Sequence, residues 1–265
     1  MAEVRYYRDP ELPVFEIKSC CSKVHASRKH AHDEFSIGVV VQGDSLVNGT
    51  GRDFTVTTGS IIIIPPEIVH QCNPENINKW QFEMLFLKKE WVFSWLDEIP
   101  PDFSISAKTL NSRDYARATR LFDLLRKEKY ELEKEAFLIT ELTHFFDFEN
   151  YFQQKPYLLV WKNSMQIVRD YLEANFLEKI SLDELASISG LSKYHLLRNF
   201  KKTYLTSPHA YQTMLRINYA KQMLKENSSE PITTIAQEAG FYDQSHFIKT
   251  FKLYYGTTPW GYRIG

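Results

Sequence analysis

The chain has 265 residues, of which 43% are hydrophobic and 25% are charged, and its formal net charge at pH 7 is -1. This length and composition allow two separate cores of ordinary domain size, so we expect two domains. The net charge by itself argues for neither a nucleic-acid partner nor an acidic surface.

The first residues, "MAEVRYYRDPELPV", are polar and aromatic. They contain no apolar run long enough to serve as a signal peptide or to span a bilayer. The three cysteines, Cys20, Cys21 and Cys72, form neither a paired framework nor a CxxC spacing, which fits a reducing compartment. We therefore expect a cytoplasmic, soluble protein with no membrane partner.

Short β-rich runs separated by turn residues fill residues 13–90. The runs are "EFSIGVVV", "SLVNGT", "RDFTVTTG", "SIIIIPP" and "WQFEMLFL", with Gly, Asn, Asp and Pro between them. Phe54 and Val56 alternate with polar neighbours as in a half-buried strand, whereas the run of isoleucines indicates a strand buried on both faces. Many short strands at near-regular spacing predict an antiparallel barrel or sandwich.

The hydrophobic pattern changes to a helical period after Asp114. Apolar residues such as Leu121, Leu125, Leu138 and Leu142 recur at helical spacing among many Lys and Glu residues. This pattern predicts two antiparallel helices. Their apolar stripes either cover the barrel or also face a second subunit, and a single sequence does not separate these alternatives.

A break around Pro156 predicts a linker over residues 154–161, followed by a new helix from about Lys162 to Phe176. The charge balance changes at the same place. From Lys162 onward there are 13 Lys and Arg against 9 Asp and Glu, a net charge of +4, which leaves -5 for residues 1–161. The C-terminal part is therefore the basic one.

One pattern occurs twice in this basic part. The stretch "LASISGLSKYHLLRNFKKTYLTSP" is echoed by "IAQEAGFYDQSHFIKTFKLYYGTTP". Matching positions are 50 apart up to the glycine, Gly190 or Gly240, and 51 apart after it. A turn at the glycine can absorb one inserted residue without disturbing packed helices. Each copy therefore predicts two helices joined by a turn.

Capping residues around the first turn support this prediction. Ser181 is a natural N-cap, and Glu184 completes a capping box with it. Gly190 supplies the left-handed residue that ends the helix, and Ser192 caps the second helix. A glycine-centred turn between two short helices is the geometry that presents the second helix to the major groove of DNA.

The second helix of each copy carries polar and basic side chains on the face that points away from the hydrophobic core of the domain. Such donors suit base edges and phosphates, while Leu197 and Ile248 can touch thymine methyl groups. The candidate DNA contacts are Lys193, Tyr194, Leu197, Arg198, Lys201 and Lys202 in the first copy and Gln244, Ser245, Lys249 and Lys252 in the second. An ordinary solvated face is the alternative, and two copies in a basic domain disfavour it.

The segment between the copies predicts one helix from Pro208 to about Glu226. About 18 helical residues span about 27 Å. That length is comparable with the roughly 34 Å between successive major-groove faces on one side of a duplex. We therefore expect both second helices to engage the same face of DNA about one turn apart.

Together, "SLDELASISGLSKYHLLRNFKK", the connecting helix and the closing "IAQEAGFYDQSHFIKTFKLYYGTTPWGYR" resemble the paired helix-turn-helix domain of the AraC/XylS family of bacterial transcription regulators. The resemblance implies base contacts from positions in both units. These are Tyr194, Leu197 and Arg198 in the first unit and Gln244, Ser245 and Lys249 in the second.

The N-terminal part resembles the sensor domain common in the same family. "RKHAHDEFSIGVVVQG" and "GSIIIIPPEIVHQCN" are similar to the two strand motifs of the cupin barrel. His30 and His32 project to the same face of one strand. With His70 and Glu34 they could hold Fe, Mn or Zn, as in a metal-dependent cupin oxygenase or isomerase.

We favour instead a pocket that takes a small molecule, without a metal, cofactor or catalytic residue. The candidate ligand contacts are His30, His32, Ser36, His70 and Trp80.

The sequence thus predicts an α+β multidomain protein. Its expected parts are a cupin-like antiparallel β-barrel over residues 8–105, a helical pair over 110–153, the linker, and an all-α domain over 162–263 with helix-turn-helix units at about 181–203 and 232–254. The predicted function is sequence-specific regulation of transcription, as an activator controlled by a small-molecule effector. The expected partners are double-stranded DNA, the effector, RNA polymerase and a second copy of the chain. A metal-dependent cupin enzyme and a helical adaptor for another protein are the alternatives.

Overall fold

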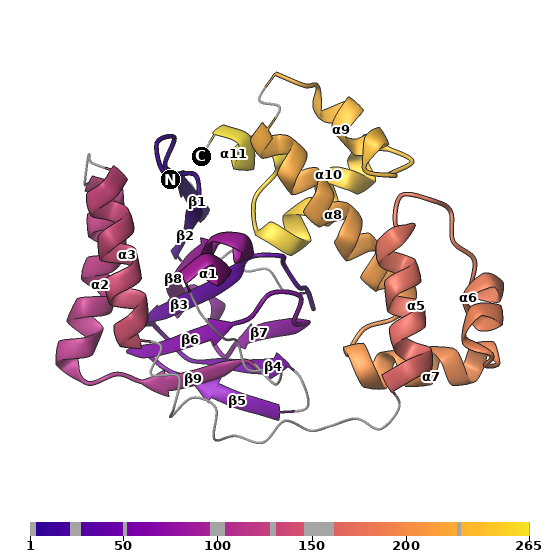
Figure 1. Ribbon diagram of the computed structural model, residues 1–265, viewed down its shortest axis with the longest axis horizontal. Coiled ribbons are helices and arrows are strands. Elements are labelled where there is room, and N and C mark those ends of the chain that lie inside the picture. The colour runs from indigo at the N-terminus through magenta and orange to yellow at the C-terminus, as the bar shows by residue number, and fades with distance from the viewer. Residues whose placement is uncertain are drawn as a thin grey trace.

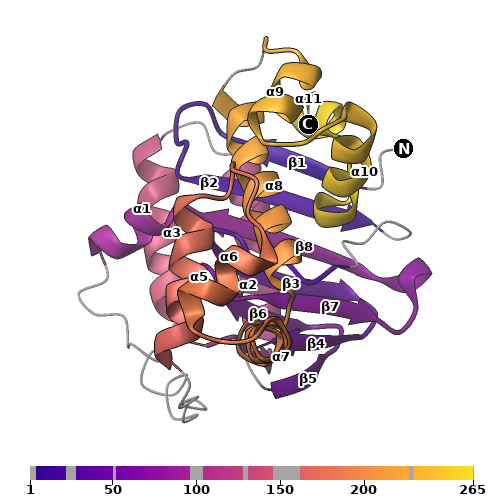
Figure 2. The same cartoon turned by 90° about the vertical axis from the view of Figure 1, so that its right-hand side faces the viewer.

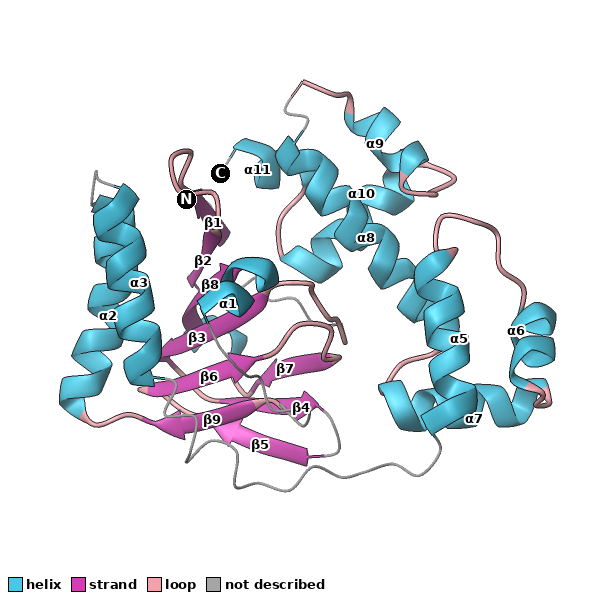
Figure 3. Cartoon of the chain, in the orientation of Figure 1, coloured by secondary structure: helices cyan, strands magenta, loops and turns pink. Residues whose placement is uncertain are grey.

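The computed structural model describes residues 4–21, 28–49, 52–95, 104–127, 131–145, 162–226 and 229–264. The first part of the chain forms β-sheets with a pair of helices beside them, and the last part is helical (Figures 1 and 3). The predicted fold class, an antiparallel sheet domain followed by an all-α domain, is confirmed. The predicted linker at 154–161 and the end of the helical pair at 146–153 lie outside the described residues.

The described strands of the first part pair in antiparallel fashion throughout. They are β1 Val4–Arg8, β2 Phe15–Cys21, β3 Phe35–Gln42, β4 Ser45–Gly49, β5 Arg52–Val56, β6 Ser60–Ile64, β7 His70–Pro74, β8 Gln81–Leu87 and β9 Ser106–Thr109. One sheet has the order β1-β2-β8-β3-β6-β9, and the other has the order β5-β4-β7. An isolated bridge between His30 and His70 joins the segment before β3 to the start of β7.

The two faces of the larger sheet contribute to two different cores. On β6, Ile61 and Ile63 pack into a core shared with the neighbouring helices. Ile62 and Ile64 point the other way, into a core that continues through the smaller sheet to the helical domain. All five residues of β6 are buried, as the isoleucine run predicted. The larger sheet therefore separates the two hydrophobic cores.

The helices beside the sheet are α1 Lys89–Trp95, α2 Ser112–Lys127 and α3 Glu131–Phe145, with the short 3-10 helix η1 at Ile77–Lys79. The apolar stripe of α2 and α3, including Leu121, Leu125, Leu138 and Leu142, packs into the core on the outer face of the sheet. The prediction that this stripe covers the sheet domain is confirmed. Its second alternative, a face for another subunit, stays a prediction.

The helical domain contains α5 Lys162–Ala174, α6 Leu182–Ser189, α7 Lys193–Tyr204, α8 Pro208–Glu226, α9 Ile232–Glu238, α10 Gln244–Tyr255 and α11 Pro259–Ile264. The predicted capping box of Ser181 and Glu184 is present, and Gly190 ends α6 with a φ of 66°. Ser192 and Asp243 cap α7 and α10. Among the described residues, no helix combines the length and the apolar character that crossing a membrane requires.

Helix α8 is the rod that joins the two helix-turn-helix units, and its 19 residues span about 28 Å. Arg216 fixes this rod to both units. Its guanidinium donates to the carbonyl oxygens of Phe176, Leu177 and Glu178 after α5 and to that of Gly240 in the second turn, at 2.7–3.1 Å. These hydrogen bonds satisfy carbonyls that follow the end of a helix, where backbone partners are missing.

The two turn glycines are expected to differ in their tolerance of a side chain. Both have a positive φ, 66° at Gly190 and 76° at Gly240, so alanine costs about 1 kcal/mol or more at either position. A Cβ at Gly190 meets nothing within 4 Å, whereas one at Gly240 lies 2.9 Å from Cζ of Arg216. We therefore expect Gly240→Ala to lower the free energy of unfolding more than Gly190→Ala in urea titrations. Equal losses would contradict the role assigned to Arg216.

Candidate nucleic-acid interface and ligand pocket

Helices α7 and α10 bury one face and expose the other. Leu196 and Phe200 of α7 and Phe247 and Phe251 of α10 are fully buried in the core. All ten side chains that the sequence singled out as DNA contacts are exposed: Lys193, Tyr194, Leu197, Arg198, Lys201, Lys202, Gln244, Ser245, Lys249 and Lys252. Their role as DNA contacts stays a prediction, and their position leaves them accessible to a partner.

Some features of this surface escaped the sequence analysis. Lys193 forms a 2.6 Å ion pair with Asp183, so a phosphate has to compete with that carboxylate for it. Tyr242, directly before the cap of α10, is 99% exposed, and Trp260 of α11 is 59% exposed. Both side chains are accessible to a partner, although single exposed aromatic residues are also ordinary on a protein surface. The signal in the sequence was the pair of aromatic residues in "GFYDQ", of which one, Phe241, is buried.

The two exposed helices point in different directions. Figure 2 looks along the axis of α7, while α10 lies across the line of sight. Successive major grooves on one face of a duplex are related by translation along the duplex axis, so helices that occupy them in the same way are nearly parallel. In this conformation the two units are therefore not arranged for simultaneous insertion into successive grooves.

A pocket opens on the inner side of the sheet domain. The space inside it, with the open mouth included, is about 590 Å³. Four of the five predicted ligand contacts, His30, His32, His70 and Trp80, line it among apolar side chains. Ser36 is fully buried and is not among the lining residues; its hydroxyl lies 3.2 Å from Nδ1 and 3.3 Å from Nε2 of His32. Ser36 therefore acts on the pocket through His32.

Lys18 of β2 also lines the pocket and was not anticipated. Its side chain lies on the buried face of the strand, 7% exposed, and burial lowers the pKa of its ammonium. In "FEIKSCC" the charged residues Glu16 and Lys18 alternate with Ile17, which places both on one face of the strand. Two charged residues on one face of a short, mostly apolar strand were the available signal. Lys18 gives the pocket a cation for an anionic ligand.

The three histidines of the pocket are neutral and close together. Burial, with the neighbouring His32, lowers the pKa of His70 to about 3, and burial lowers that of His32 to about 4. Burial also brings the pKa of His30 well below its ordinary value. One ring nitrogen of each lies within 4.8 Å of those of the other two. Neutral imidazoles in this arrangement can accept hydrogen bonds from a ligand or coordinate a cation.

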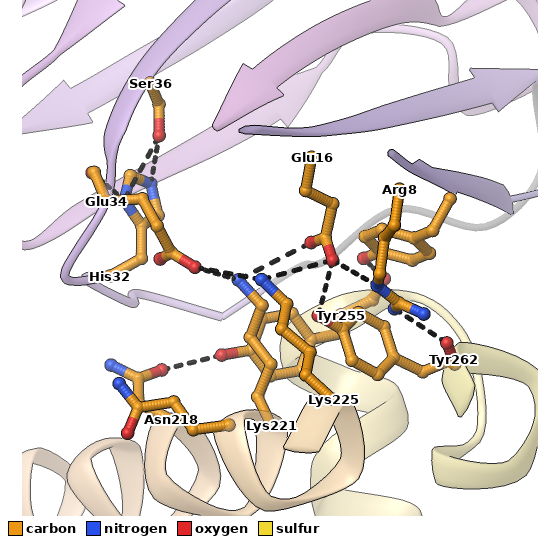
Figure 4. A network of polar contacts seen from close by, with 12 residues as sticks. Arg8, Glu16, His32, Glu34, Ser36, Asn218, Lys221, Lys225, Tyr255 and Tyr262 are labelled. Carbon is orange, nitrogen blue, oxygen red and sulfur yellow. Dashed lines mark hydrogen bonds and ion pairs between the residues drawn. The ribbon is translucent and has the colours of Figure 1, made fainter. Parts of the chain in front are cut away.

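Glu34 does not join the histidines. Its carboxylate points to helix α8, where Oε1 accepts from Nζ of Lys221 at 2.6 Å (Figure 4). In the alternative of a cupin enzyme, Glu34 is the optional fourth metal ligand. The structure assigns it to the contact between the domains instead, because it is turned toward a buried ammonium.

Lys221 is the centre of a buried ionic network between the domains. Its side chain is 3% exposed and lies between Glu34 and Glu16, with Oε1 of Glu16 at 3.7 Å. Lys225, one turn further along α8, lies 3.2 Å from Glu16 and 3.6 Å from Glu34. Arg8 donates to the same Glu16 at 2.7 Å. Three cations thus surround two carboxylates in a region with little water.

The pKa values of these groups reflect mutual stabilisation. Burial alone would raise the pKa of Glu16 and Glu34, but Lys221 and Lys225 hold both below the ordinary range of a carboxyl group. Burial alone would lower the pKa of Lys221, and the two carboxylates raise it instead. Lys225 differs, because burial and the neighbouring Lys221 lower its pKa. Glu16, Glu34 and Lys221 therefore hold one another in their charged forms.

Further contacts extend this interface along the C-terminal helices. The hydroxyl of Tyr262 in α11 donates to Glu16 at 2.8 Å, and Arg8 donates to the carbonyl of Tyr262 at 2.7 Å. The hydroxyl of Tyr6 donates to the carbonyl of Tyr255 at the end of α10 at 2.9 Å. Strands β1 and β2 therefore contact the second helix-turn-helix unit directly.

The segment before β3 contacts both the pocket and the rod. The amide of Ala31 donates to Sδ of Met214, and its carbonyl accepts from Asn218 at 3.0 Å. Nζ of Lys29 donates to the carbonyl of Leu205, the C-cap of α7, at 2.9 Å. Two residues of this segment, His30 and His32, line the pocket. The segment 29–34 therefore links the pocket wall to α7 and α8.

The sequence did not reveal this docking face of α8. Its members, Met214, Asn218, Lys221 and Lys225, are spaced by four, three and four residues, so they share one side of the helix. Mixed polarity of this kind is typical of a solvated face. This side of α8 is buried because Glu16 and Glu34, which are distant in the sequence, pair with its lysines. The position of these carboxylates cannot be obtained from the spacing of residues within α8.

The comparisons with known proteins agree with this layout. A family model described as an AraC-like ligand binding domain matches residues 12–145, and one described as a helix-turn-helix domain matches residues 185–264. YbfI of Bacillus subtilis, described as an uncharacterized HTH-type transcriptional regulator, is 28% identical over 225 residues, which are 82% of this chain and 80% of YbfI.

Two other comparisons concern one domain and the overall fold. The multiple antibiotic resistance protein MarA of Salmonella typhimurium is 38% identical over 97 residues, which are 37% of this chain and 76% of MarA. The crystal structure of ToxT from Vibrio cholerae aligns with a TM-score of 0.62 and 13% identity, covering 95% of this chain and 97% of ToxT. The ToxT likeness shows a common fold.

Removal of the central ammonium is expected to destabilise the protein. Lys221→Met leaves two buried carboxylates short of a cation, and breaking a buried ion pair costs about 3 to 5 kcal/mol. We expect the lower end of this range in urea titrations, because Lys225 remains beside both carboxylates. Lys225→Met is the matched control with a smaller loss, since its side chain is 29% exposed. An equal or greater loss for Lys225→Met would contradict the central position of Lys221.

Proposed function

The chain belongs to the AraC family of transcriptional regulators, with its ligand-binding and helix-turn-helix domains, and we propose that α7 and α10 bind DNA sequence-specifically under the control of a small molecule in the pocket. The observation that carries this proposal is the pair of exposed, partly basic helix faces at the two ends of one rigid helix. Such faces fit major-groove recognition, with Arg198 suited to a guanine and Lys201, Lys202 and Lys252 suited to phosphates.

The position of the pocket supports control by an effector. A ligand that contacts His30 or His32 acts on the segment 29–34, whose other residues hold α7 and α8. Movement of that segment changes the docking of the rod and frees the end of α7 that Lys29 contacts, so that the first unit can turn relative to α8 until α7 and α10 are parallel. The docked conformation is then the state of lower DNA affinity. The ligand and the DNA are coupled through one two-state element, as allosteric control requires.

The lining of the pocket favours a small anionic effector. Lys18 supplies a positive charge, and the neutral histidines supply hydrogen-bonding nitrogens in a mostly apolar cavity. A solved structure of ToxT is described as bound to an unsaturated fatty acid. That ligand combines a carboxylate with an apolar chain, which is the chemistry that this pocket offers.

Further parts of the proposal come from the sequence. We propose a cytoplasmic activator that meets RNA polymerase at the promoter and pairs with a second copy of itself. A relative from Staphylococcus xylosus, 20% identical over 232 residues, is named a lactose operon transcription activator. The enzyme alternative is disfavoured because Glu34, the carboxylate considered as its fourth ligand, binds Lys221 instead.

The DNA-binding proposal is tested with duplexes selected from a random library by the full chain. Arg198→Ala is expected to weaken binding to the selected duplex by about 1 to 3 kcal/mol and to relax the preference at one base pair. Lys201→Ala is expected to weaken binding to all duplexes about equally and to reduce the salt dependence by about one phosphate contact. Fluorescence anisotropy over a salt series measures both effects.

Lys179→Ala is the control for these variants, since Lys179 is exposed and lies outside α7 and α10. It is expected to keep the wild-type affinity and preference. Selection that yields no preferred sequence, or an Arg198→Ala variant with unchanged preference, would show that the recognition surface is assigned incorrectly.

The coupling proposal predicts that loosening the rod strengthens DNA binding. Asn218→Ala removes the hydrogen bond from α8 to Ala31, and we expect affinity for the selected duplex to rise by up to about fivefold, equivalent to about 1 kcal/mol for one hydrogen bond. Tyr255→Phe is the matched control. It removes the 2.7 Å bond from Tyr255 to Asn218 but leaves the contact with Ala31 in place, so the affinity is expected to stay unchanged. Equal changes of DNA affinity in both variants would contradict the proposal that the docking of segment 29–34 controls DNA affinity.

A further inference from the structure

The three pocket histidines are held in one tautomer by the backbone. Nδ1 of His30 lies 2.8 Å from the carbonyl oxygen of Arg28, that of His32 lies 3.0 Å from the carbonyl of Glu34, and that of His70 lies 2.8 Å from the carbonyl of Ile68. A carbonyl oxygen can only accept a hydrogen bond, so each Nδ1 carries the proton. Each Nε2 is left with a lone pair. Imidazoles that ligate metals are oriented in this way.

The imidazole rings of the three histidines lie close together in the pocket. The ring centroids of His30 and His70 are 4.3 Å apart, and those of His32 and His70 are 5.0 Å apart. His30 and His70 are also tied together by two backbone hydrogen bonds of 2.8 and 2.9 Å, which fix the positions of both residues. Three neighbouring acceptors on a rigid frame leave room for a shared cation.

We propose that Nε2 of His30, His32 and His70 together bind one divalent transition-metal ion, with a coordination position left open toward the pocket. Imidazole ligands suit Zn²⁺, Fe²⁺, Cu²⁺ and Ni²⁺. Zn–N bonds of about 2.1 Å place two nitrogens of a tetrahedral site about 3.4 Å apart. Ring nitrogens of the three histidines now lie within 4.8 Å of one another, so the rings have to close by up to about 1.4 Å. The hydroxyl of Ser36, 3.3 Å from Nε2 of His32, gives way to the ion.

The neighbouring ammonium of Lys18 shapes what the open position takes. It lines the same pocket and opposes a bare cation, but it favours an ion that carries an anionic ligand. A carboxylate effector would complete the coordination. This last step rests on the proposed function, whereas the metal site does not.

The test uses the purified full chain without a histidine tag, treated with a chelator and then titrated with Zn²⁺ or Co²⁺. We expect one equivalent of Zn²⁺ to remain bound through gel filtration, and visible Co²⁺ absorption bands typical of nitrogen and oxygen ligands. Substitution of a ligand, His30→Gln or His70→Gln, is expected to weaken binding at least 100-fold. His209→Gln is the control, since His209 is exposed on α8, and it should bind one equivalent as tightly as the wild type.

Less than a tenth of an equivalent in the wild type, or full affinity in His70→Gln, would overturn the metal site. Circular dichroism checks that each variant is folded; if a variant is not, the stoichiometry and the Co²⁺ spectrum of the unaltered chain decide. DNA affinity of the metal-free chain is measured in parallel. Retained DNA binding without metal binding removes the metal site alone, and metal binding without DNA binding removes the proposed function alone.

Discussion

The buried ammonium of Lys221 between the carboxylates of Glu16 and Glu34 is the interaction on which the arrangement of the two domains depends. Charges enter an interior only when partners offset the loss of water, and here the ammonium comes from the helical domain while both carboxylates come from the sheet domain. The sheet domain therefore cannot move away from α8 without either exposing these groups to water or leaving a charge unpaired. Hydrophobic packing alone would allow many orientations, whereas the ion pairs and the hydrogen bonds of Ala31 and Tyr262 specify one.

The same interface explains why a pocket in one domain can influence helices in the other. The core on the inner face of the sheet runs without a break into the core of the helical domain, so Phe86 and Met84 belong to the same cluster as Phe251 and Tyr262. The pocket lies on this inner face. On the outer face, a separate core holds α2 and α3 and leaves that side free of the coupling. A ligand thus acts where the domains meet, and the opposite side is available for other contacts.

Sequence reasoning succeeded where the determinant is local. The isoleucine run of β6, the capping box of Ser181 and the left-handed Gly190 each specify their own structure through neighbouring residues, and the structure agrees with all three. It failed where the determinant is distant. Lys18 and Lys221 are buried because of residues far away in the chain. Glu34 entered only as an optional ligand of the enzyme alternative, and nothing in its local sequence indicated its contact with α8. The convergence of His30, His32 and His70 was foreseen from motif resemblance, but the carbonyls that fix their tautomers required the fold.

The buried ionic network between the domains has a consequence for evolution. Two domains encoded side by side can be exchanged between genes by recombination only if their interface residues stay compatible. In this chain, a sheet domain taken from another protein would need carboxylates at the positions of Glu16 and Glu34 to pair with the lysines of α8. A helical domain taken from another protein would need lysines that pair with these carboxylates. The sheet domain and the helical domain are therefore expected to coevolve at these positions.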